Sequence, residues 1–197
     1  MSTELKLKAN DVVGVQEFGS AFAVSGDYTI VGARHDGFDP GAAYVFEKNG
    51  AVWVEQAKLS ASDTTGFDHF GAAVGMDDDY AIIGASQGGI GSRGQAYIFH
   101  RNGSDWVEDT ILFANGETDD ALFGQSVSIS GDCAIVGSDK AAYMFQRTGS
   151  TWTEEAKLTP DEAPISGDRF RSMETMPSWE LPISINRPRS AQHTSFS

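Results

Sequence analysis

The chain has 197 residues, of which 40% are hydrophobic and 11% aromatic, and its formal net charge is −14. A chain of this length can bury one sizeable core. The acidic balance argues against binding to nucleic acid or to an anionic membrane surface, since both require a basic protein surface. Cations or basic partners fit this charge better. The 22 glycines are typical of a protein made of strands and turns. The single cysteine, Cys133, allows no internal disulfide, and we expect it to be a small buried residue.

Three similar segments follow one another along the chain. Each opens with a Phe-Gly pair, continues through a Tyr/Cys-x-Ile-Val/Ile-Gly run and ends with a Tyr-x-Phe segment. The pairs are Phe18-Gly19, Phe70-Gly71 and Phe123-Gly124. Their spacing is 52 and 53 residues. A period near 50 residues, with four strands in each repeat, is the signature of β-propeller blades.

The middle copy predicts four short strands. Residues 70–76 and 80–84 are too continuously apolar for an exposed face, and Asp78-Asp79 between them marks a turn. Residues 95–100 alternate as a strand does, and Asn102-Gly103 is a strong hairpin signal because both positions tolerate a positive φ. Residues 106–112 supply a fourth strand, and the charged side chains among them suit an edge strand. We therefore predict an all-β fold of consecutive four-stranded antiparallel blades, with helix nearly absent, the Phe-Gly strands innermost and the Trp strands outermost.

We expect these blades to form an incomplete propeller of about three blades plus flanking strands. The three repeats are expected at about residues 11–62, 63–115 and 116–162. In front of them, Lys6-Leu7-x-Ala9-x-Asp11 matches Lys58-Leu59-x-Ala61-x-Asp63, so residues 3–9 are expected to be the last strand of a blade whose other strands are missing. A fourth repeat begins at residues 167–170. The predicted repeat domain therefore spans residues 1–170, with partial repeats at both ends.

These repeats resemble the FG-GAP repeats, the propeller repeats also found in integrin α-subunits. The resemblance rests on the Phe-Gly pairs, the Ile-Val-Gly-Ala run at residues 30–33, the Gly-x-Ala-Tyr-x-Phe strands that start at Gly41 and Gly94, and the Trp-containing outer strands. It implies a propeller of several blades, commonly seven, that acts as a non-catalytic binding or adhesion module for a protein or glycan. It also suggests an extracellular or cell-surface location, whereas residues 1–10 lack the continuous apolar region of a signal peptide. The compartment is therefore left open.

No catalytic, cofactor-binding or metal-binding residue is predicted. Residues 89–94 satisfy the dinucleotide glycine pattern, but they precede a strand and follow no βα unit, so we expect a flexible loop. The serines lack a nucleophile-elbow context. Asn102-Gly103-Ser104 matches the sequence pattern of an N-glycosylation acceptor, but a hairpin turn already accounts for the Asn-Gly pair. The histidines share no zinc-type spacing and are expected on the surface. They are His35, His69, His100 and His193.

Acidic residues recur in the loops that lead into the first strand of each repeat. They are Asp63, Asp68, Asp119, Asp120 and Asp168, with Asp36 and Asp39 in another loop. Calcium needs six to eight oxygen ligands, several of them from one compact loop. The calcium loop that integrin-type repeats often carry alternates aspartates and ends in glycine, and this chain has no such loop. We therefore expect solvated acidic turns and no cofactor, with a weak calcium site as the alternative.

The C-terminal residues 171–197 differ in kind from the repeats. Four of the six prolines and only one glycine lie in the last 35 residues, and proline at that density breaks strands. A shifted reading frame over residues 173–181 permits Gly-Asp-Tyr-Ala-Ile-Val-Gly-Ala, and over residues 191–195 it permits Gly-Ser-Ala-Tyr-Val. Both match the repeat motifs. We predict a frameshifted or wrongly spliced continuation of the fourth repeat that is poorly ordered and dispensable.

Two other interpretations of function stay open. The repeat family also accompanies phospholipase domains, so the chain could be a fragment of a larger hydrolase, and a truncated frameshift product would have no independent function. A row of three blades would leave one apolar face bare at each end, because each blade is covered by two neighbours. Phe22, Val24, Ile129 and Ile135 belong to the end repeats and keep the apolar pattern. We therefore expect self-association.

Overall fold

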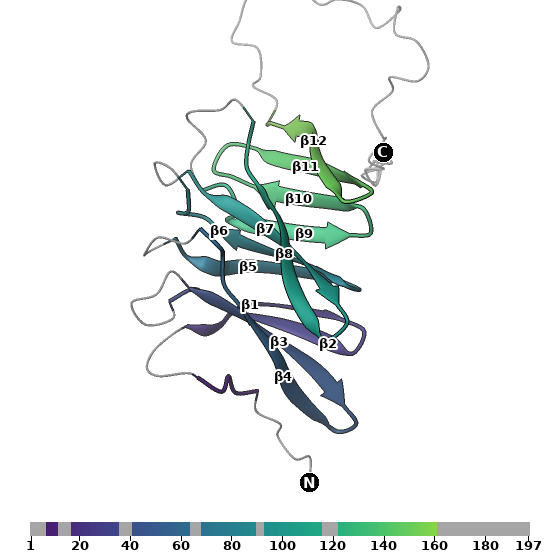
Figure 1. Cartoon of the computed structure of the whole chain (residues 1–197). Coiled ribbons are helices and arrows are strands. Elements are labelled where there is room, and N and C mark those ends of the chain that lie inside the picture. Colours follow the sequence, from purple (N-terminus) through teal and green to yellow (C-terminus); the bar gives the residue numbers. More distant parts are fainter. Residues whose placement is uncertain are drawn as a thin grey trace, which may run out of the picture. The chain divides into compact units, whose positions relative to one another are not determined.

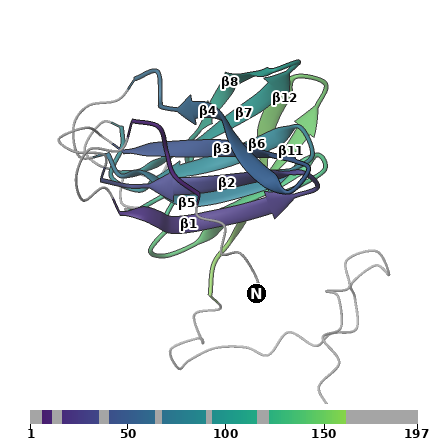
Figure 2. The same ribbon diagram turned by 90° about the horizontal axis from the view of Figure 1, so that it is seen from below.

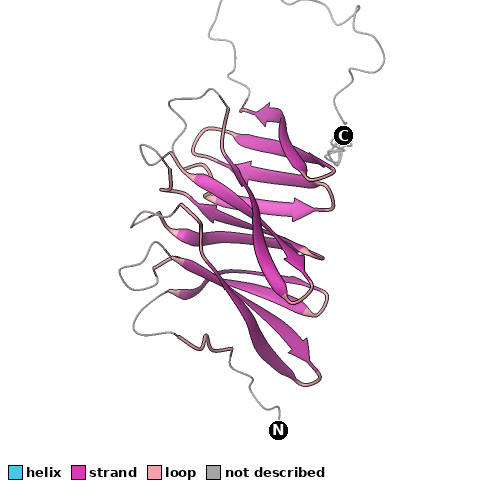
Figure 3. Ribbon diagram, in the orientation of Figure 1, coloured by secondary structure: helices cyan, strands magenta, loops and turns pink. Residues whose placement is uncertain are grey.

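The computed structural model describes residues 7–11, 17–35, 41–63, 68–89, 93–115 and 122–160. These residues belong to one of two compact units, Met1–Asp161, and the second unit, Glu162–Ser197, lies outside the described residues. The described part contains three four-stranded antiparallel sheets and no helix (Figures 1 and 3). The all-β prediction is therefore confirmed. The interpretation of residues 171–197 stays a prediction.

Each sheet is a meander whose strands pair in chain order. The first sheet contains β1 (Phe18–Ser25), β2 (Tyr28–Ala33), β3 (Ala42–Asn49) and β4 (Val52–Leu59). The second contains β5 (Phe70–Asp77), β6 (Tyr80–Ala85), β7 (Gln95–Asn102) and β8 (Asp105–Leu112). The third contains β9 (Ser126–Ser130), β10 (Cys133–Gly137), β11 (Ala142–Thr148) and β12 (Thr151–Leu158).

The hairpin turns lie where they were predicted, with a shift of one residue in one of them. Asp78, in the turn between β5 and β6, has a φ of 48°. Between β7 and β8 the turn consists of Gly103, with a φ of 68°, and Ser104, whereas Asn102 is the last residue of β7. The outer hairpin of every sheet also carries a register shift, as between Ile98 and Phe99 in β7. A shift of this kind leaves one residue of the outer strand without a direct partner and re-aims its side chain. In the first sheet that residue is Gln56.

The three sheets pack side by side as blades, with β1 against β5 and β5 against β9. Figure 2 shows β1 and β5 on one side of the stack and β4, β8 and β12 on the other. The outer strands carry Trp53, Trp106 and Trp152, as the sequence predicted. Phe123 differs slightly from the expectation, because it lies ahead of β9 and forms an isolated bridge with Gly94 of the second blade.

The cores lie between the blades rather than inside any one of them. Tyr97 and Phe99 of β7 belong to the core between the first and second blades, and Ala96 and Ile98 belong to the core between the second and third. The alternation of β7 thus places large side chains on both faces of the sheet. The middle sheet is buried on both faces, which explains why its strands read as continuously apolar.

The N-terminal segment corrects one expectation. Residues 7–9 are not in a strand, and residues 3–6 lie outside the described part. Leu7 and Ala9 nevertheless pack against the first blade, on the face of Tyr44. Asp11 accepts a hydrogen bond from the hydroxyl of Tyr44 at 2.9 Å, as Asp63 does from Tyr97 at 2.8 Å. The sequence match between the two segments therefore reflects the same packing, formed by irregular chain rather than by a strand.

The end faces are only partly bare. Phe22 and Val24 of β1 are 74% and 64% exposed, and Ile135 of β10 is 38% exposed. Ile129 is buried because it faces the second blade, so its assignment to a bare end was wrong. Cys133 is exposed rather than buried. It occupies the position of Tyr28 and Tyr80, on the face of the third blade that no described blade covers.

Candidate functional site at the blade junctions

An arginine of each later blade contacts a tyrosine of the blade before it. Arg101 of β7 lies over the ring of Tyr28 of β2, with its guanidinium carbon 4.6 Å from the ring centroid. Its Nη1 donates a hydrogen bond to the Tyr28 hydroxyl at 3.1 Å, and its Nη2 forms an ion pair with Asp79. Trp106 packs edge-on against the same tyrosine, with centroids 6.4 Å apart. Together these contacts join the outer parts of the first and second blades.

The second junction repeats this arrangement. Arg147 lies over Tyr80 at 4.0 Å, donates to its hydroxyl and pairs with Asp132. Trp152 packs edge-on against Tyr80 at 6.4 Å. Such cation–π contacts contribute roughly 0.5–2 kcal/mol each, more when they are desolvated. In the sequence, the only signal of this contact is the recurrence of Arg at matching positions of the second and third repeats.

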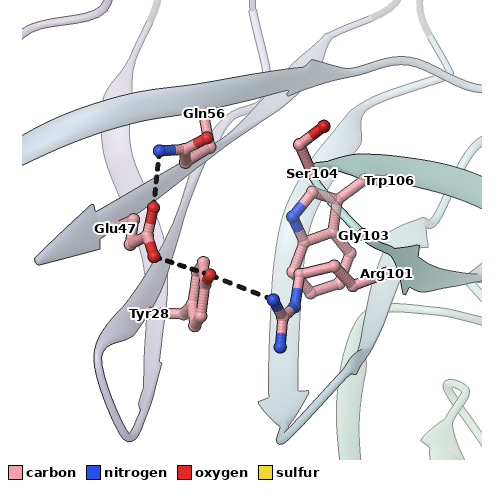
Figure 4. A pocket seen from close by; sticks show the side chains of 7 residues that line it. All are labelled: Tyr28, Glu47, Gln56, Arg101, Gly103, Ser104 and Trp106. Atoms are coloured by element: carbon pink, nitrogen blue, oxygen red, sulfur yellow. Dashed lines mark hydrogen bonds between the residues drawn. The ribbon is translucent and has the colours of Figure 1, made fainter.

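A cavity of about 250 Å³ opens beside the first junction. Figure 4 shows its lining, which is Tyr28, Glu47, Gln56, Arg101, Gly103, Ser104 and Trp106. Glu47 accepts hydrogen bonds from the Tyr28 hydroxyl at 2.9 Å and from Nε2 of Gln56 at 2.7 Å. Burial, followed by the hydrogen bond to Glu47, raises the pKa of Tyr28, so this hydroxyl stays protonated at neutral pH.

Two donors beside this cavity have no acceptor in the structure. The indole Nε1 of Trp106 and the Nε of Arg101 are both buried, and neither forms a hydrogen bond. The same is true of Trp152 and Arg147 at the second junction. Figure 4 shows the indole nitrogen of Trp106 on the edge of the ring that faces Glu47 and Gln56. An unpaired buried donor costs roughly 1–3 kcal/mol, so a bound acceptor would be stabilised here.

A second cluster lies at the opposite end of β2, where the chain leaves the sheet. The rings of His35 and His69 are 4.7 Å apart, and Arg34 pairs with Glu17 beside them. Burial lowers the pKa of His69, and the neighbouring His35 and Arg34 lower it further. Both histidines are only partly buried, and their contact brings together residues far apart in sequence.

The other histidines have separate surroundings. The Nδ1 of His100 lies 3.8 Å from Asp109, and His193 lies outside the described residues.

The last residue of the glycine-rich segment 89–94 takes part in packing between blades. Gly94 has a φ of 92° and forms a β-bridge with Phe123, which leads into the third blade.

The acidic loop residues are structural where the structure describes them. Asp63 is an exposed turn residue, as expected, and it accepts hydrogen bonds from Tyr97 and Gln95. Asp68 is only 5% exposed, so the expectation of a solvated turn residue was wrong for it. The pKa of Tyr97 is raised by burial and by its hydrogen bond to Asp63. Within the described ranges, no group of three or more His, Cys, Asp or Glu side chains could hold a metal ion. The remaining candidates lie outside those ranges. They are Asp36, Asp39, Asp119, Asp120 and Asp168.

Glutamates of the outer strands hold the connections between blades. The backbone amide of Ser62 donates to Glu108 of β8 at 2.9 Å, and its hydroxyl donates to the same carboxylate at 2.7 Å. The amides of Asn10 and Asn115 donate in the same way to Glu55 and Glu154. A charged acceptor strengthens such hydrogen bonds. Each connection is thus fixed to the blade that follows it.

The family model described as FG-GAP repeat matches residues 1–46, 53–99 and 106–150, which is more than half of the chain. The chain belongs to the FG-GAP repeat family. A comparison with curated proteins finds no match. Among the residues that the structure describes, no helix has the length and apolarity needed to span a membrane.

The FG-GAP motif has a physical basis at each junction. The phenylalanine of each Phe-Gly pair packs edge-on between the two aromatic rings of its own Tyr-x-Phe strand, as Phe70 does at 5.2 Å from Tyr97. The glycine that follows meets the preceding blade. A Cβ at Gly32 would lie 2.0 Å from the carbonyl oxygen of Gly71, and a Cβ at Gly84 would lie 1.9 Å from that of Gly124. The two glycines of the motif therefore let neighbouring sheets approach backbone to backbone.

Proposed function

We propose that this FG-GAP repeat chain is a non-catalytic binding module for a protein or glycan partner. The observation that carries the proposal is the cavity at the first junction. The cavity is lined by residues of two packed sheets, and two buried donors beside it have no acceptor. A concave surface with a few fixed polar groups is the usual form of a binding site, and a rigid scaffold keeps it preorganised.

The test is binding to two arrays, one of glycans and one of folded extracellular proteins, with the purified full chain as the probe. Retention on defined spots of either array, lost when unlabelled chain competes, would support the proposal. In parallel, the chain is incubated with soluble phosphodiester and carboxyl-ester substrates. Saturable turnover of either substrate would contradict a non-catalytic module, and failure to bind any spot on both arrays would contradict a binding module.

We also propose that the chain associates with itself through its two end faces. Phe22 and Val24 correspond to Val74 and Met76, which are buried against the first blade. Ile135 corresponds to Ile82, which is buried against the third blade. The two exposed faces therefore resemble the two halves of the interface that joins consecutive blades. A second copy placed head to tail would cover both with contacts of the same kind.

A further inference from the structure

The cavity at the first junction has two walls of different chemistry. Glu47 and Gln56 of the first blade face Ser104 and Trp106 of the second (Figure 4). Its volume of about 250 Å³ is at the small end of ligand pockets, which are typically about 300–1,000 Å³. It therefore suits one small cyclic compound, or one residue of a larger molecule, rather than an extended chain lying along it.

The hydrogen-bonding capacity of these walls is only partly used. Each carboxylate oxygen of Glu47 accepts one hydrogen bond from the protein, from Tyr28 and from Gln56. A carboxylate oxygen can accept two, so each can take another donor. On the other wall, the indole Nε1 of Trp106 is buried with no partner. The cavity therefore calls for a ligand that donates to Glu47 and accepts from Trp106.

Charge narrows the class of ligand. The guanidinium of Arg101 is already paired with Asp79 and lies over Tyr28. Glu47 accepts its hydrogen bonds from two neutral groups, the Tyr28 hydroxyl and the Gln56 amide. The whole chain carries a formal charge of −14. An anionic ligand would meet an unfavourable potential, since its charge adds to that of Glu47. Neutral hydroxyl groups meet the requirement, because each one both donates and accepts.

We propose that this cavity binds one neutral sugar residue of a glycan. Hydroxyls of the sugar donate to Glu47 and accept from Nε1 of Trp106, and the C–H face of the sugar ring packs against the aromatic lining. This inference rests on the proposed binding function and names the ligand class of its site. A peptide amide, which also donates and accepts, is the alternative that the experiment separates from a sugar.

The second junction provides a matched comparison within the same molecule. It retains the Tyr, Arg and Trp, but His100 and Asp109 occupy the register positions of Glu47 and Gln56. The third blade has Gln146 at the same position. Glutamine is therefore compatible with the blade at this position, and Glu47→Gln is a conservative test of the acceptor wall.

The experiment uses the indole N–H signals of the ¹⁵N-labelled full chain, which contains four tryptophans. Trp106→Phe assigns the signal of interest by deleting it. The probes are the methyl glycosides of glucose, galactose, mannose and N-acetylglucosamine, with acetamide and glycylglycine amide as amide probes. We expect a saturable shift of the Trp106 signal with at least one glycoside, with a millimolar dissociation constant, as befits a ligand of about a dozen non-hydrogen atoms.

The variants decide whether the shift comes from this site. Glu47→Gln and Gln56→Ala should each weaken binding about tenfold, because a charge-assisted hydrogen bond or its orienting partner is lost. His100→Gln, at the matching position of the second junction, should leave the affinity unchanged. Retained dispersion of the backbone spectrum shows that each variant is folded.

Three results would overturn the inference. The first is no shift of the Trp106 signal with any glycoside up to about 50 mM, well above a millimolar dissociation constant. The second is an affinity that Glu47→Gln and Gln56→Ala leave unchanged. The third is a shift with the amide probes alone, which would assign the cavity to a peptide. In each case the array experiment can still show partner binding, so the failure of this inference is distinct from failure of the proposed function.

Discussion

The glycines that join the blades allow the packing argument to be tested with matched variants. Gly19 and Gly71 are the glycines of the first and second Phe-Gly pairs, with φ values of 93° and 87°. Alanine at either position has the same backbone strain, about 1–3 kcal/mol. The surroundings differ. A Cβ at Gly19 would have nothing within 4 Å, whereas one at Gly71 would lie 2.2 Å from the carbonyl oxygen of Ala42 in the first blade.

The extra cost of Gly71→Ala follows from that distance. Ordinary contact begins at 3.4 Å, so the two sheets must separate by roughly 1 Å, which forfeits about a quarter to a half of the dispersion energy of the separated contacts. Overpacking of this kind costs about 1–3 kcal/mol, sometimes more. We therefore expect Gly71→Ala to lower the free energy of unfolding by about 1–3 kcal/mol more than Gly19→Ala does.

A second pair of glycines tests the contact between blades without any contribution from backbone strain. Gly84 and Gly137 hold the same place in β6 and β10, and neither has a positive φ. A Cβ at Gly84 would meet the backbone oxygen of Gly124, whereas one at Gly137 would meet the movable Oγ of Ser126. At an unstrained site, Gly→Ala stabilises by about 0.4–1 kcal/mol. Gly84→Ala should thus destabilise the chain, and Gly137→Ala should be close to neutral.

Urea unfolding followed by tryptophan fluorescence measures all four variants. With an m value of about 1–3 kcal/mol per molar urea, the difference within each pair should displace the midpoint by about 1 M. Equal losses for Gly19→Ala and Gly71→Ala, together with a neutral Gly84→Ala, would refute the argument that direct backbone contact joins the blades.

Three further outcomes are expected. Arg101→Lys should lower the free energy of unfolding by about 1 kcal/mol, because lysine cannot both stack on the Tyr28 ring and bond to two partners at once. Lys48→Arg, at the matching position of the first blade, should change the free energy of unfolding little. Equal effects of the two substitutions on the urea unfolding curves would contradict this. Sedimentation velocity across a concentration range should show association that Phe22→Ser weakens, and a compact monomer at every concentration would exclude the end-face contact. Deletion of residues 171–197 should shift the melting temperature by less than about 2 °C, and a loss of many degrees would show that they belong to the fold.

The repeat pattern predicted the sheets well because the spacing of apolar residues along the chain follows which side chains are buried. The spacing of Phe-Gly pairs located the inner strands, and the alternation of residues 95–100 located a strand with two packed faces, since each face covers a different neighbour. The same logic failed for residues 7–9. Their match to the end of β4 recorded how Leu7 and Ala9 pack, and packing positions alone do not specify the backbone conformation.

The candidate site was not predictable in the same way. Tyr28 and Arg101 lie 73 residues apart and meet only because consecutive blades stack. Their contact has no local spacing that a single repeat would reveal. The exposure of Cys133 has the same origin. Its counterpart Tyr28 is covered by an arginine of the following blade, so burial at this position depends on the neighbour rather than on the repeat itself.

The histidine pair gives the chain a pH dependence whose sign can be derived. The pKa of His69 is lowered in the folded state, chiefly by burial and then by His35 and Arg34, while Glu17 and Asp68 act in the opposite direction. Above its unfolded pKa of 6.5, both states are neutral and stability is highest. As the pH falls below 6.5 toward the folded value, the unfolded chain binds the proton first, so the free energy of unfolding decreases.

We therefore expect the urea midpoint to fall between pH 7.5 and about 5.5, a window in which exposed carboxylates stay ionised. His69→Gln should flatten this fall, because the shifted group is gone. His35→Gln should reduce it only in part, since burial, the largest cause of the shift, persists when the neighbouring charge is removed. An unchanged fall in His69→Gln would show that another group sets the acid sensitivity. A fall that His35→Gln abolishes completely would mean that the charge of the neighbouring ring, and not burial at the junction, keeps His69 neutral.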